Sequence, residues 1–436
     1  MYVISGRDDY RYVKLNIFLV LYMCLISNLQ IAPLSIGVII LALGFFNKPE
    51  YLLPSVLISS LLGDHFVAFA GMGMSRITVI AYILICAFKN IRGDFSFSRK
   101  SVIYVYGACA FCFFSSWLSL TGQLKPAITM ILNLVMLLFM CFNRVRNVEL
   151  FFENIKYSIW IFSAYIFLLV ISGWRVIYVE ERLTLDGANS NVLGMCLAQL
   201  IIFLLTIMVS ESNKKFIFID FLFIVLDFYV LLLTGSRSAL IATGVVVVLF
   251  LLKKIAEHEH MFRNVLLLIG GACAIIVAYK LIKMYNPILL ARFTIEDVMR
   301  DGGSGRRDIW EAMLTYVIPY NLLFGVGLGG GNTIVAMAPY VFEALGVHNL
   351  YLTVLAQVGI VGSVMFYAFW IRCFFSAMKY GKNIINIHIP LYMIFTAFVN
   401  GIGEEVFSER YLWFCAGLVF MLIYNAKFVR FQEAVQ

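Results

Sequence analysis

Charge is scarce in this chain of 436 residues, of which only 13% are Asp, Glu, Lys or Arg. About a quarter of the residues of a soluble globular protein are charged. The chain therefore has too little polar surface to remain in water, and a soluble enzyme is excluded. Disordered proteins combine low hydrophobicity with high charge, whereas 62% of this chain is apolar, so disorder is excluded as well. The composition is that of a protein whose solvent is a lipid bilayer.

The nine cysteines are also absent from long loops, where metal-binding clusters would be expected. All lie in or at the edge of apolar segments, and the closest pair is Cys109 and Cys112 inside one hydrophobic run. Buried cysteines at helix interfaces are the simpler interpretation, with zinc or redox chemistry at this pair as the alternative. Glu257 to His260 could also bind a metal, but the two lysines just before this segment favour a solvated charged turn.

Long apolar segments fill most of the chain. A transmembrane helix needs about 20 predominantly apolar residues. One segment is short, and Asp64 and His65 interrupt another, so the sequence predicts 12 to 14 transmembrane helices. The segments lie near residues 12–31, 34–47, 51–70, 76–91, 101–121, 126–143, 153–173, 191–210, 216–233, 237–252, 264–282, 347–371, 384–402 and 410–426.

Positive charge is concentrated in every second loop from residue 92 onward. Cytoplasmic loops of membrane proteins carry an excess of Lys and Arg, so the alternation places these loops and both chain ends in the cytoplasm. Although the net charge is +8, the positive residues do not form one basic surface, and no nucleic-acid partner is predicted. The residues are Arg92, Arg99, Lys100, Arg144, Arg146, Lys214, Lys215, Lys253, Lys254, Arg263, Arg372, Lys379, Lys382, Lys427 and Arg430.

One outer loop, residues 283–346, is far longer than an ordinary connection. Loops of this length are usually functional or disordered, and this one contains an amphipathic segment at 306–318. Its helical periodicity predicts a structured outer loop whose helix lies along the membrane surface. The predicted apolar face consists of Trp310, Met313, Leu314, Val317 and Ile318. The chain then divides into N-terminal transmembrane helices (1–282), the large loop (283–346) and C-terminal transmembrane helices (347–436).

The outer loops contain more arginine than this topology predicts. A guanidinium is always charged and matches two phosphate oxygens at once, so arginines gathered above a membrane indicate an anionic lipid headgroup such as a diphosphate. The alternative for any one arginine is an ion pair with an outer acidic residue: Glu180, Glu181, Asp186, Glu404, Glu405 or Glu409. The arginines are Arg175, Arg182, Arg237, Arg292, Arg300, Arg306, Arg307 and Arg410.

His348 begins a predicted transmembrane helix directly after the long loop. A neutral imidazole at this position could accept a proton as a general base. A lone histidine there is more often structural, but the arginines nearby favour chemistry.

Two other polar features have open interpretations. Asp220 and Asp227, seven residues apart on one predicted helix, could relay protons in a transporter. The segment 325–331, which contains five glycines, looks like a phosphate-binding loop. No strand-to-helix unit surrounds it, however, so the dinucleotide-binding pattern is not met.

Four stretches occur in a fixed order between residues 182 and 362. Arg182 before Asp186-Gly-Ala-Asn-Ser-Asn191 is similar to an R…G-x-x-x-N element, and Thr234-Gly-Ser-Arg-Ser-Ala239 to T-x-S-R-x-A. Ser304-Gly-Arg-Arg-Asp-Ile-Trp310 with Phe324-Gly-Val-Gly-Leu-Gly329 is similar to S-G-R-x-x-x-W…G-x-G. Val347-His-Asn-Leu-Tyr-Leu352 with Gly359-Ile-Val-Gly362 is similar to H-N-x-x-L…G-x-x-G. In order and spacing, these motifs resemble those of the O-antigen ligase/polymerase superfamily of bacterial membrane glycosyltransferases.

This resemblance implies an all-α polytopic membrane protein of the GT-C type, with its site on the periplasmic face of the bacterial inner membrane. The donor would be a glycan on undecaprenyl diphosphate, and neither a metal nor another cofactor would be needed. Membrane lipid would be a further partner, and the resemblance also admits a chain-length regulator protein.

The resemblance also suggests roles for individual residues. Arg237 and Arg306 would bind the diphosphate, and His348 would be the catalytic base. The secondary candidates are Arg182 and Arg307 for the diphosphate, and Glu404 and Glu405 for sugar hydroxyls or for holding the arginines.

The motifs do not separate the members of the superfamily. A polymerase transfers the growing glycan to a new lipid-linked repeat unit, whereas a ligase transfers it to the lipid A core. Nothing in the sequence is dedicated to a lipid A core, which favours the polymerase. A flippase for lipid-linked sugars is the non-enzymatic alternative, but it predicts repeated halves and mid-membrane polar residues, and no internal repeat is evident.

Overall fold

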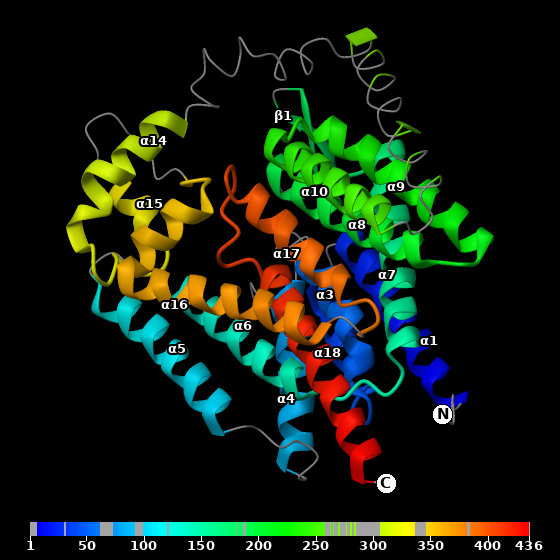
Figure 1. Cartoon of the computed structure of the whole chain (residues 1–436). Helices are drawn as coiled ribbons and strands as arrows, with labels where there is room; N and C mark the ends of the chain where they lie inside the picture. Colours follow the sequence, from blue (N-terminus) through cyan, green and yellow to red (C-terminus); the bar gives the residue numbers. More distant parts are fainter. Residues whose placement is uncertain are drawn as a thin grey trace.

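The computed structural model is a bundle of helices with one small two-stranded sheet (Figure 1). It describes residues 7–29, 32–61, 73–91, 99–119, 122–179, 181–185, 189–257, 306–335, 346–381 and 384–435, together with residues 262, 265, 269–270, 276, 280 and 283–284. The α-helices are α1 (Arg7–Leu29), α2 (Ser35–Leu43), α3 (Leu53–Leu61), α4 (Met74–Ile91), α5 (Arg99–Leu118), α6 (Leu124–Phe142), α7 (Val148–Ser172), α8 (Ser190–Ser210), α9 (Lys214–Thr234), α10 (Arg237–Ala256), α14 (Arg306–Ala312), α15 (Gly330–Val335), α16 (Leu350–Tyr380), α17 (His388–Asn400) and α18 (Arg410–Val435). Short 3₁₀ turns cover Ala32–Leu34, Pro49–Leu52 and Pro319–Asn321.

The predicted all-α polytopic membrane fold is confirmed. Among the described residues, seven helices are long and apolar enough to cross a membrane by length and composition: most of α1, then α6 to α10, and α16. The sequence predicted 12 to 14 spans, but α2, α3 and α17 have only 9, 9 and 13 residues and do not meet this criterion. The predicted span at 264–282 falls almost entirely outside the described residues.

Helix α8 lies inside the bundle, where α9, α10 and α17 pack against it. It is apolar along its whole length, and 94% of its most apolar window is buried within the protein. A helix that is hydrophobic all round has no polar face to present to solvent and is therefore buried. By contrast, only 22% of the corresponding window of α9 is buried, which leaves most of that helix for lipid contact.

Both ends of the chain lie at one end of the bundle, whereas β1 and α14 lie at the other (Figure 1). Helix α18 packs against α3, α6 and α17, so helices from the beginning and the end of the chain share one hydrophobic core. Lys156, near the start of α7, forms an ion pair with Glu211, which follows α8, and their Nζ and Oε2 atoms are 2.9 Å apart. This arrangement agrees with the predicted placement of both termini on the same side.

Asp220 and Asp227 on α9 are both bonded to α7. Asp220 accepts a hydrogen bond from Trp160 Nε1 at 2.7 Å, and Asp227 accepts one from Ser163 Oγ at 2.8 Å. Interhelical hydrogen bonds of this kind hold transmembrane helices together. The two carboxylates therefore fasten α9 to α7, which favours a structural role over the transporter relay.

A β-hairpin at the end of the bundle opposite the termini was not predicted from the sequence. Strands β1 (Val176–Val179) and β2 (Arg182–Leu185) pair antiparallel, with Val179 opposite Arg182. Glu181, in the turn, has a left-handed backbone with φ of +61°. Two runs of four residues give too short an alternating pattern to distinguish strands from an ordinary loop.

The predicted amphipathic helix at 306–318 is present as α14 followed by a π-helical turn, Met313–Val317. Ile318 N donates to Met313 O at 2.9 Å, five residues back. This extra residue in the turn rotates the following side chains relative to a regular α-helix. Met313, Val317 and Ile318 of the predicted apolar face are buried in a small hydrophobic cluster of the protein, whereas Leu314 of the same predicted face is 56% exposed.

The glycine-rich segment packs against a break in α16. At Gly359, φ is +63° and ψ is −169°, and the helix kinks there. In a continuous helix, Ile360 N and Val361 N would donate to the carbonyls of Ala356 and Gln357. Here they donate to Leu322 O (2.9 Å) and Leu323 O (3.1 Å).

The two freed carbonyls are satisfied by the same loop. Ala356 O accepts from Val326 N at 2.9 Å, and Gln357 O accepts from Gly327 N at 3.0 Å. The loop thus replaces every backbone hydrogen bond lost at these positions, which is how a broken helix is tolerated at membrane depth. This backbone contact is a structural explanation for the glycines that had suggested a phosphate-binding loop.

We expect Gly359→Ala to destabilise the protein by about 2 kcal/mol or more, since a non-glycine residue in this backbone region is strained. The added Cβ would also lie 2.4 Å from the carbonyl carbon of Leu323. Thermal unfolding of the purified protein in detergent, followed by tryptophan fluorescence, measures the change. The control is Gly107→Ala on α5, where the Cβ meets nothing within 4 Å. An unchanged melting temperature for Gly359→Ala would contradict this account.

Candidate active site

The segment before α16 fixes the position of His348. Asn349 caps the helix: its Oδ1 accepts from Tyr351 N at 2.9 Å and from Leu352 N at 3.0 Å. On one side, Trp310 Nε1 donates to Val347 O at 3.0 Å, and on the other Leu350 N donates to Gly401 O at 2.7 Å. His348 itself has a φ of +49°. A left-handed backbone at a non-glycine residue is uncommon and clusters at functional sites.

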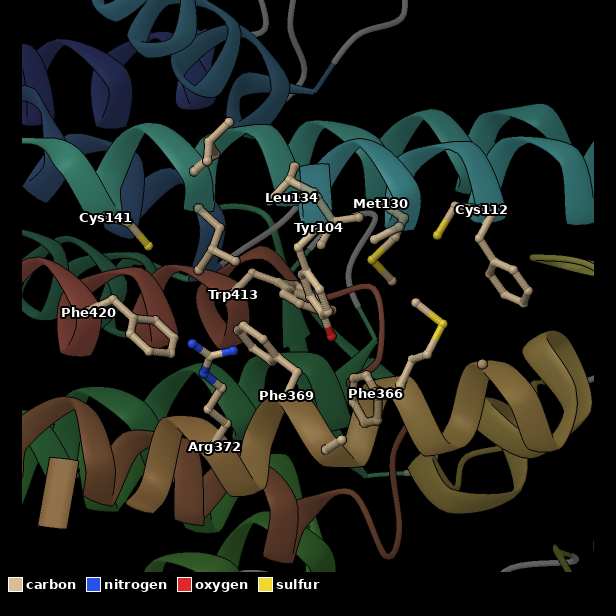
Figure 2. Close-up of a pocket in the computed structure, with 18 of the residues that line it drawn as sticks. Tyr104, Cys112, Met130, Leu134, Cys141, Phe366, Phe369, Arg372, Trp413 and Phe420 are labelled. Atoms are coloured by element: carbon tan, nitrogen blue, oxygen red, sulfur yellow. The ribbon is translucent and has the colours of Figure 1, made fainter. Parts of the chain in front are cut away.

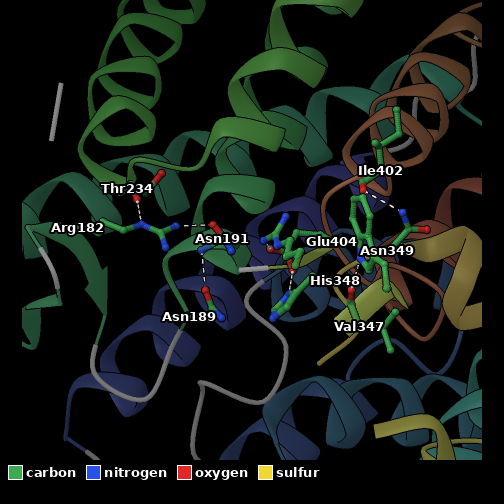
Figure 3. A network of polar contacts seen from close by, with 11 residues as sticks. Arg182, Asn189, Asn191, Thr234, Val347, His348, Asn349, Ile402 and Glu404 are labelled. Carbon is green, nitrogen blue, oxygen red and sulfur yellow. Dashed lines mark hydrogen bonds and ion pairs between the residues drawn. The ribbon is translucent and has the colours of Figure 1, made fainter. Parts of the chain in front are cut away.

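Glu404 is bonded both to His348 (Figure 3) and to Arg306. Its Oε2 is 3.0 Å from His348 Nδ1, and its Oε1 is 3.2 Å from Arg306 Nη2. The side chain is buried, with only 6% of its surface exposed. Because a carboxylate paired with a permanently charged guanidinium is acceptor-only, Nδ1 must carry the hydrogen in this contact. In the neutral imidazole, Nε2 then has the lone pair.

The turn that carries Glu404 also brings the start of α10 to the cluster. A Cβ at Gly403 would lie 2.8 Å from Ser238 Cβ and 3.1 Å from Arg306 Nη1. Glycine at this position therefore allows Arg306 and Ser238 to approach the turn closely. Three motifs that are distant in sequence, around residues 237, 306 and 348, meet at the turn 401–405.

Arg237, partly buried, is the first residue of α10. The N-terminus of a helix carries a partial positive charge from its unpaired N–H groups. A guanidinium at this position adds to that field, which makes the start of α10 attractive to an anion. The preceding turn packs closely on α8, where a Cβ at Gly194 would lie 2.6 Å from Ser236 Cβ.

Arg182 joins the hairpin to two helices (Figure 3). Its Nε donates to Thr234 O at 2.9 Å, and its Nη2 donates to Asn191 Oδ1. These bonds connect β2 to the C-terminal end of α9 and the first turn of α8. Arg182 therefore positions the turn that leads into Arg237.

Among the residues that the structure describes, Arg307 and Glu405 form no hydrogen bond or ion pair with Glu404 or with the two side chains bonded to it. Arg307 is exposed, and within the described part of the chain it forms no ion pair, so the structure does not bring it into the cluster with Glu404. Glu405 is partly buried, and its Oε1 accepts from Gln357 Nε2 at 3.3 Å. Burial raises the pKa of Glu405, while the Gln357 hydrogen bond and His348 lower it.

Sequence reasoning missed several residues that organise this site, among them Gln357, Asn349, Trp310 and Asn191. Asn349, Trp310 and Asn191 lie inside the recognised motifs, but none of them had been given a role in the site. Gln357 carried no signal, because a single amide in an apolar helix has no pattern. Four of the candidate charged residues of the predicted outer loops lie outside the described residues: Glu180, Asp186, Arg292 and Arg300.

Residues 222–367, about one third of the chain, match the family model described as O-Antigen ligase. The chain carries an O-antigen ligase family domain. The resemblance to the O-antigen ligase/polymerase superfamily, predicted from the motifs, is thereby confirmed. No curated protein matches the chain.

The O-antigen ligase family domain contains Arg237, Arg306, Arg307 and His348. Glu404 and Glu405 follow the matched segment, and Arg182 precedes it. The pair of bonds at Glu404 therefore joins this domain to the turn between α17 and α18. The family is a glycosyltransferase-like enzyme family that acts on lipid-linked glycans in membranes, and the chain is a multi-pass membrane protein.

The raised pKa of Glu405 predicts a dependence of stability on pH. A carboxyl whose pKa is raised by folding binds its proton more tightly in the folded state. Its contribution to stability is fully present below its ordinary pKa of 4.5 and is lost as the pH rises through the folded-state pKa. We expect Glu405→Gln to reduce the fall in melting temperature between pH 4.5 and neutrality. Glu149→Gln, at an exposed residue in the first turn of α7, is the control, and identical slopes for wild type and Glu405→Gln would contradict the assignment.

Proposed function

We propose that this protein is a polymerase that joins undecaprenyl-diphosphate-linked oligosaccharide repeat units into O-antigen or a related surface polysaccharide. The reaction is a metal-independent glycosyl transfer at the periplasmic face of the bacterial inner membrane. The end of the bundle that carries β1 and α14 faces the periplasm in this proposal, and both termini are cytoplasmic.

The observation that carries the proposal is the pair of contacts at Glu404. One buried carboxylate holds a histidine through Nδ1 and an arginine through Nη2. A histidine fixed in this way presents Nε2 as a base, because the partner of one ring nitrogen sets the role of the other. Arg306 bonds to the other oxygen of the same carboxylate. Glu404 therefore fixes the position of the proposed base relative to the guanidinium.

The proposed step transfers a sugar from a diphosphate to a hydroxyl. The acceptor hydroxyl gives its proton to His348 Nε2 as its oxygen bonds to the anomeric carbon of the donor glycan. The bond between that carbon and the diphosphate oxygen breaks, and the diphosphate leaves with the electron pair. Glu404 stabilises the imidazolium that forms.

Arg306 and Arg237 stabilise the leaving diphosphate. Negative charge increases on the diphosphate as its bond to the sugar breaks, and preorganised positive groups lower the energy of that transition state. Arginine is suited to this role because its planar fork bonds two phosphate oxygens. Arg182 and Arg307 are secondary contacts of the diphosphate. The main role of Arg182 is to hold the turn that precedes Arg237.

A ligase is the second candidate, because the matching family model is described by that name. Ligase and polymerase share the donor and the leaving group and differ in the acceptor. A chain-length regulator protein is an additional partner that the polymerase would require for a defined glycan length.

The lipopolysaccharide ladder of a deletion strain tests the proposal. We expect lipid A core bearing a single repeat unit, restored to a ladder by the wild-type gene. Bare core with no repeat unit would instead identify a ligase. Loss of periplasmic lipid-linked repeat units would identify a flippase and reject the enzymatic proposal.

A further inference from the structure

A large cavity lies between α5 and α6 on one side and α16 and α18 on the other (Figure 2). Its volume is about 730 Å³. The lining is almost wholly apolar and aromatic, including Leu134, Phe366, Phe369, Trp413 and Phe420. A space of this size and character inside a membrane bundle suits hydrocarbon chains.

The two ends of the cavity differ. One end is lined by Val358 and Phe407, next in sequence to Gln357 and close to Glu405 of the candidate active site. The other end is lined by Arg372, Lys427 and the ring of Tyr104. Fourteen residues separate Val358 from Arg372 along α16, which corresponds to about 21 Å of helix. The cations therefore lie towards the end of the bundle that carries both chain termini.

Arg372 is exposed, and it has no ion pair or hydrogen bond with any residue in the described part of the chain. Figure 2 shows its guanidinium directed into the space between α16 and α6. Its neighbours Ile371, Phe374 and Phe375 are 55%, 54% and 62% exposed, as expected of a helix face in lipid. An arginine in a lipid-facing apolar setting is costly unless an anion accompanies it.

Lys427 lines the same end of the cavity from α18. Its ammonium lies 3.9 Å from the centroid of the Tyr380 ring, which holds the side chain near the helix surface. Two cations at the mouth of an apolar cavity match an amphiphile with an anionic head and hydrocarbon tails. Basic pockets between transmembrane helices bind anionic phospholipid headgroups in this way.

The position of the cations distinguishes this ligand from a glycan donor. A donor bound for transfer has its diphosphate beside Arg306 and His348, at the opposite end of the bundle. Its headgroup could not reach Arg372 at the same time. A phospholipid of the other leaflet would place its phosphate at the end of the bundle where Arg372 and Lys427 lie, with its acyl chains along the apolar lining of the cavity.

We propose that this cavity is a binding site for an anionic phospholipid of the leaflet opposite the candidate active site, with the phosphate on Arg372 and Lys427 and an acyl chain between α5, α6, α16 and α18. The proposal goes beyond glycosyl transfer; only its distinction from a donor site rests on the proposed function. Through Val358 and Phe407, the bound chain would lie against the elements that hold the glycine-rich loop and Glu405.

Native mass spectrometry of the full-length protein, titrated in detergent with phosphatidylglycerol or phosphatidylcholine, tests the headgroup site. We expect retention of phosphatidylglycerol in preference to phosphatidylcholine. Arg372→Gln and Lys427→Gln together should weaken phosphatidylglycerol binding about thirty-fold, or about five-fold for each cation. The control is Lys379→Gln with Arg146→Gln, which removes the same net charge from residues that do not line the cavity.

A second pair of variants tests the cavity itself. Ala368→Trp places an indole on the lining of α16, whereas Ala110→Trp places one on an exposed part of α5 outside the cavity. The first should abolish retention of phosphatidylglycerol and the second should not. Equal retention of both phospholipids, unchanged binding in the double Gln variant, or retention of a polyprenyl phosphate in place of phosphatidylglycerol would overturn the proposal.

Discussion

Replacing His348 by Gln should lower the rate of glycosyl transfer by about 10²- to 10⁴-fold, the usual contribution of a positioned general base. Glutamine can donate a hydrogen bond to Glu404 but cannot accept a proton from the sugar hydroxyl. The protein should remain folded and should still bind the lipid-linked donor. Turnover of purified enzyme with a lipid-linked glycan, measured beside donor binding, separates these two effects.

Glu404→Gln tests whether the carboxylate acts through His348. The amide would no longer enforce a hydrogen on Nδ1, so the ring could present the wrong nitrogen to the acceptor. Residues that act as one unit have non-additive effects. The double variant His348→Gln with Glu404→Gln should therefore be scarcely slower than His348→Gln alone.

The control for this series is His388→Gln, the same substitution at a histidine on α17, at the end of the bundle that carries the termini. It should keep turnover close to that of the wild type once the amounts of protein are equalised. Near-normal turnover of His348→Gln would show that another group is the base, with Glu405 the next residue to test.

Arg306→Lys and Arg237→Lys should each lower the transfer rate although they preserve charge. Lysine offers a point charge in place of a planar fork and cannot bond two phosphate oxygens in the same geometry. Loss of such a contact costs about 2–4 kcal/mol, or roughly 30- to 1000-fold in rate. For Arg306 the loss includes its bond to Glu404 Oε1.

The two arginines should differ in one measurable respect. If Arg306 also positions Glu404, its effect should depend on the presence of Glu404, whereas that of Arg237 should not. A double-mutant cycle with Glu404→Gln measures this coupling. Arg146→Lys, an exposed residue before α7, is the matched control. Wild-type ladders from Arg306→Ala and Arg237→Ala at normal protein levels would refute the diphosphate role.

The sequence by itself determined that the protein's solvent is a bilayer, that its fold is helical, and that it resembles the O-antigen ligase/polymerase superfamily. Low charge and long apolar runs leave a chain no alternative to a bilayer, where only helices or closed barrels satisfy the backbone. The Arg and His motifs were also readable, because each is a short run of residues with a distinctive spacing. Composition, apolar runs and short motifs are properties of residues close together in the chain, so they can be recognised without knowledge of the fold.

Only the tertiary structure decided how the site is connected. Glu404 lies 98 residues from Arg306 and 56 from His348, and nothing in the local sequence distinguished it from Glu405. The exchange of backbone hydrogen bonds between the glycine-rich loop and the break at Gly359 was hidden for the same reason. The π-turn that exposes Leu314 also depends on what α14 packs against. Each of these features is a contact between segments distant in the chain, and such contacts are fixed by packing, which periodicity and composition do not encode.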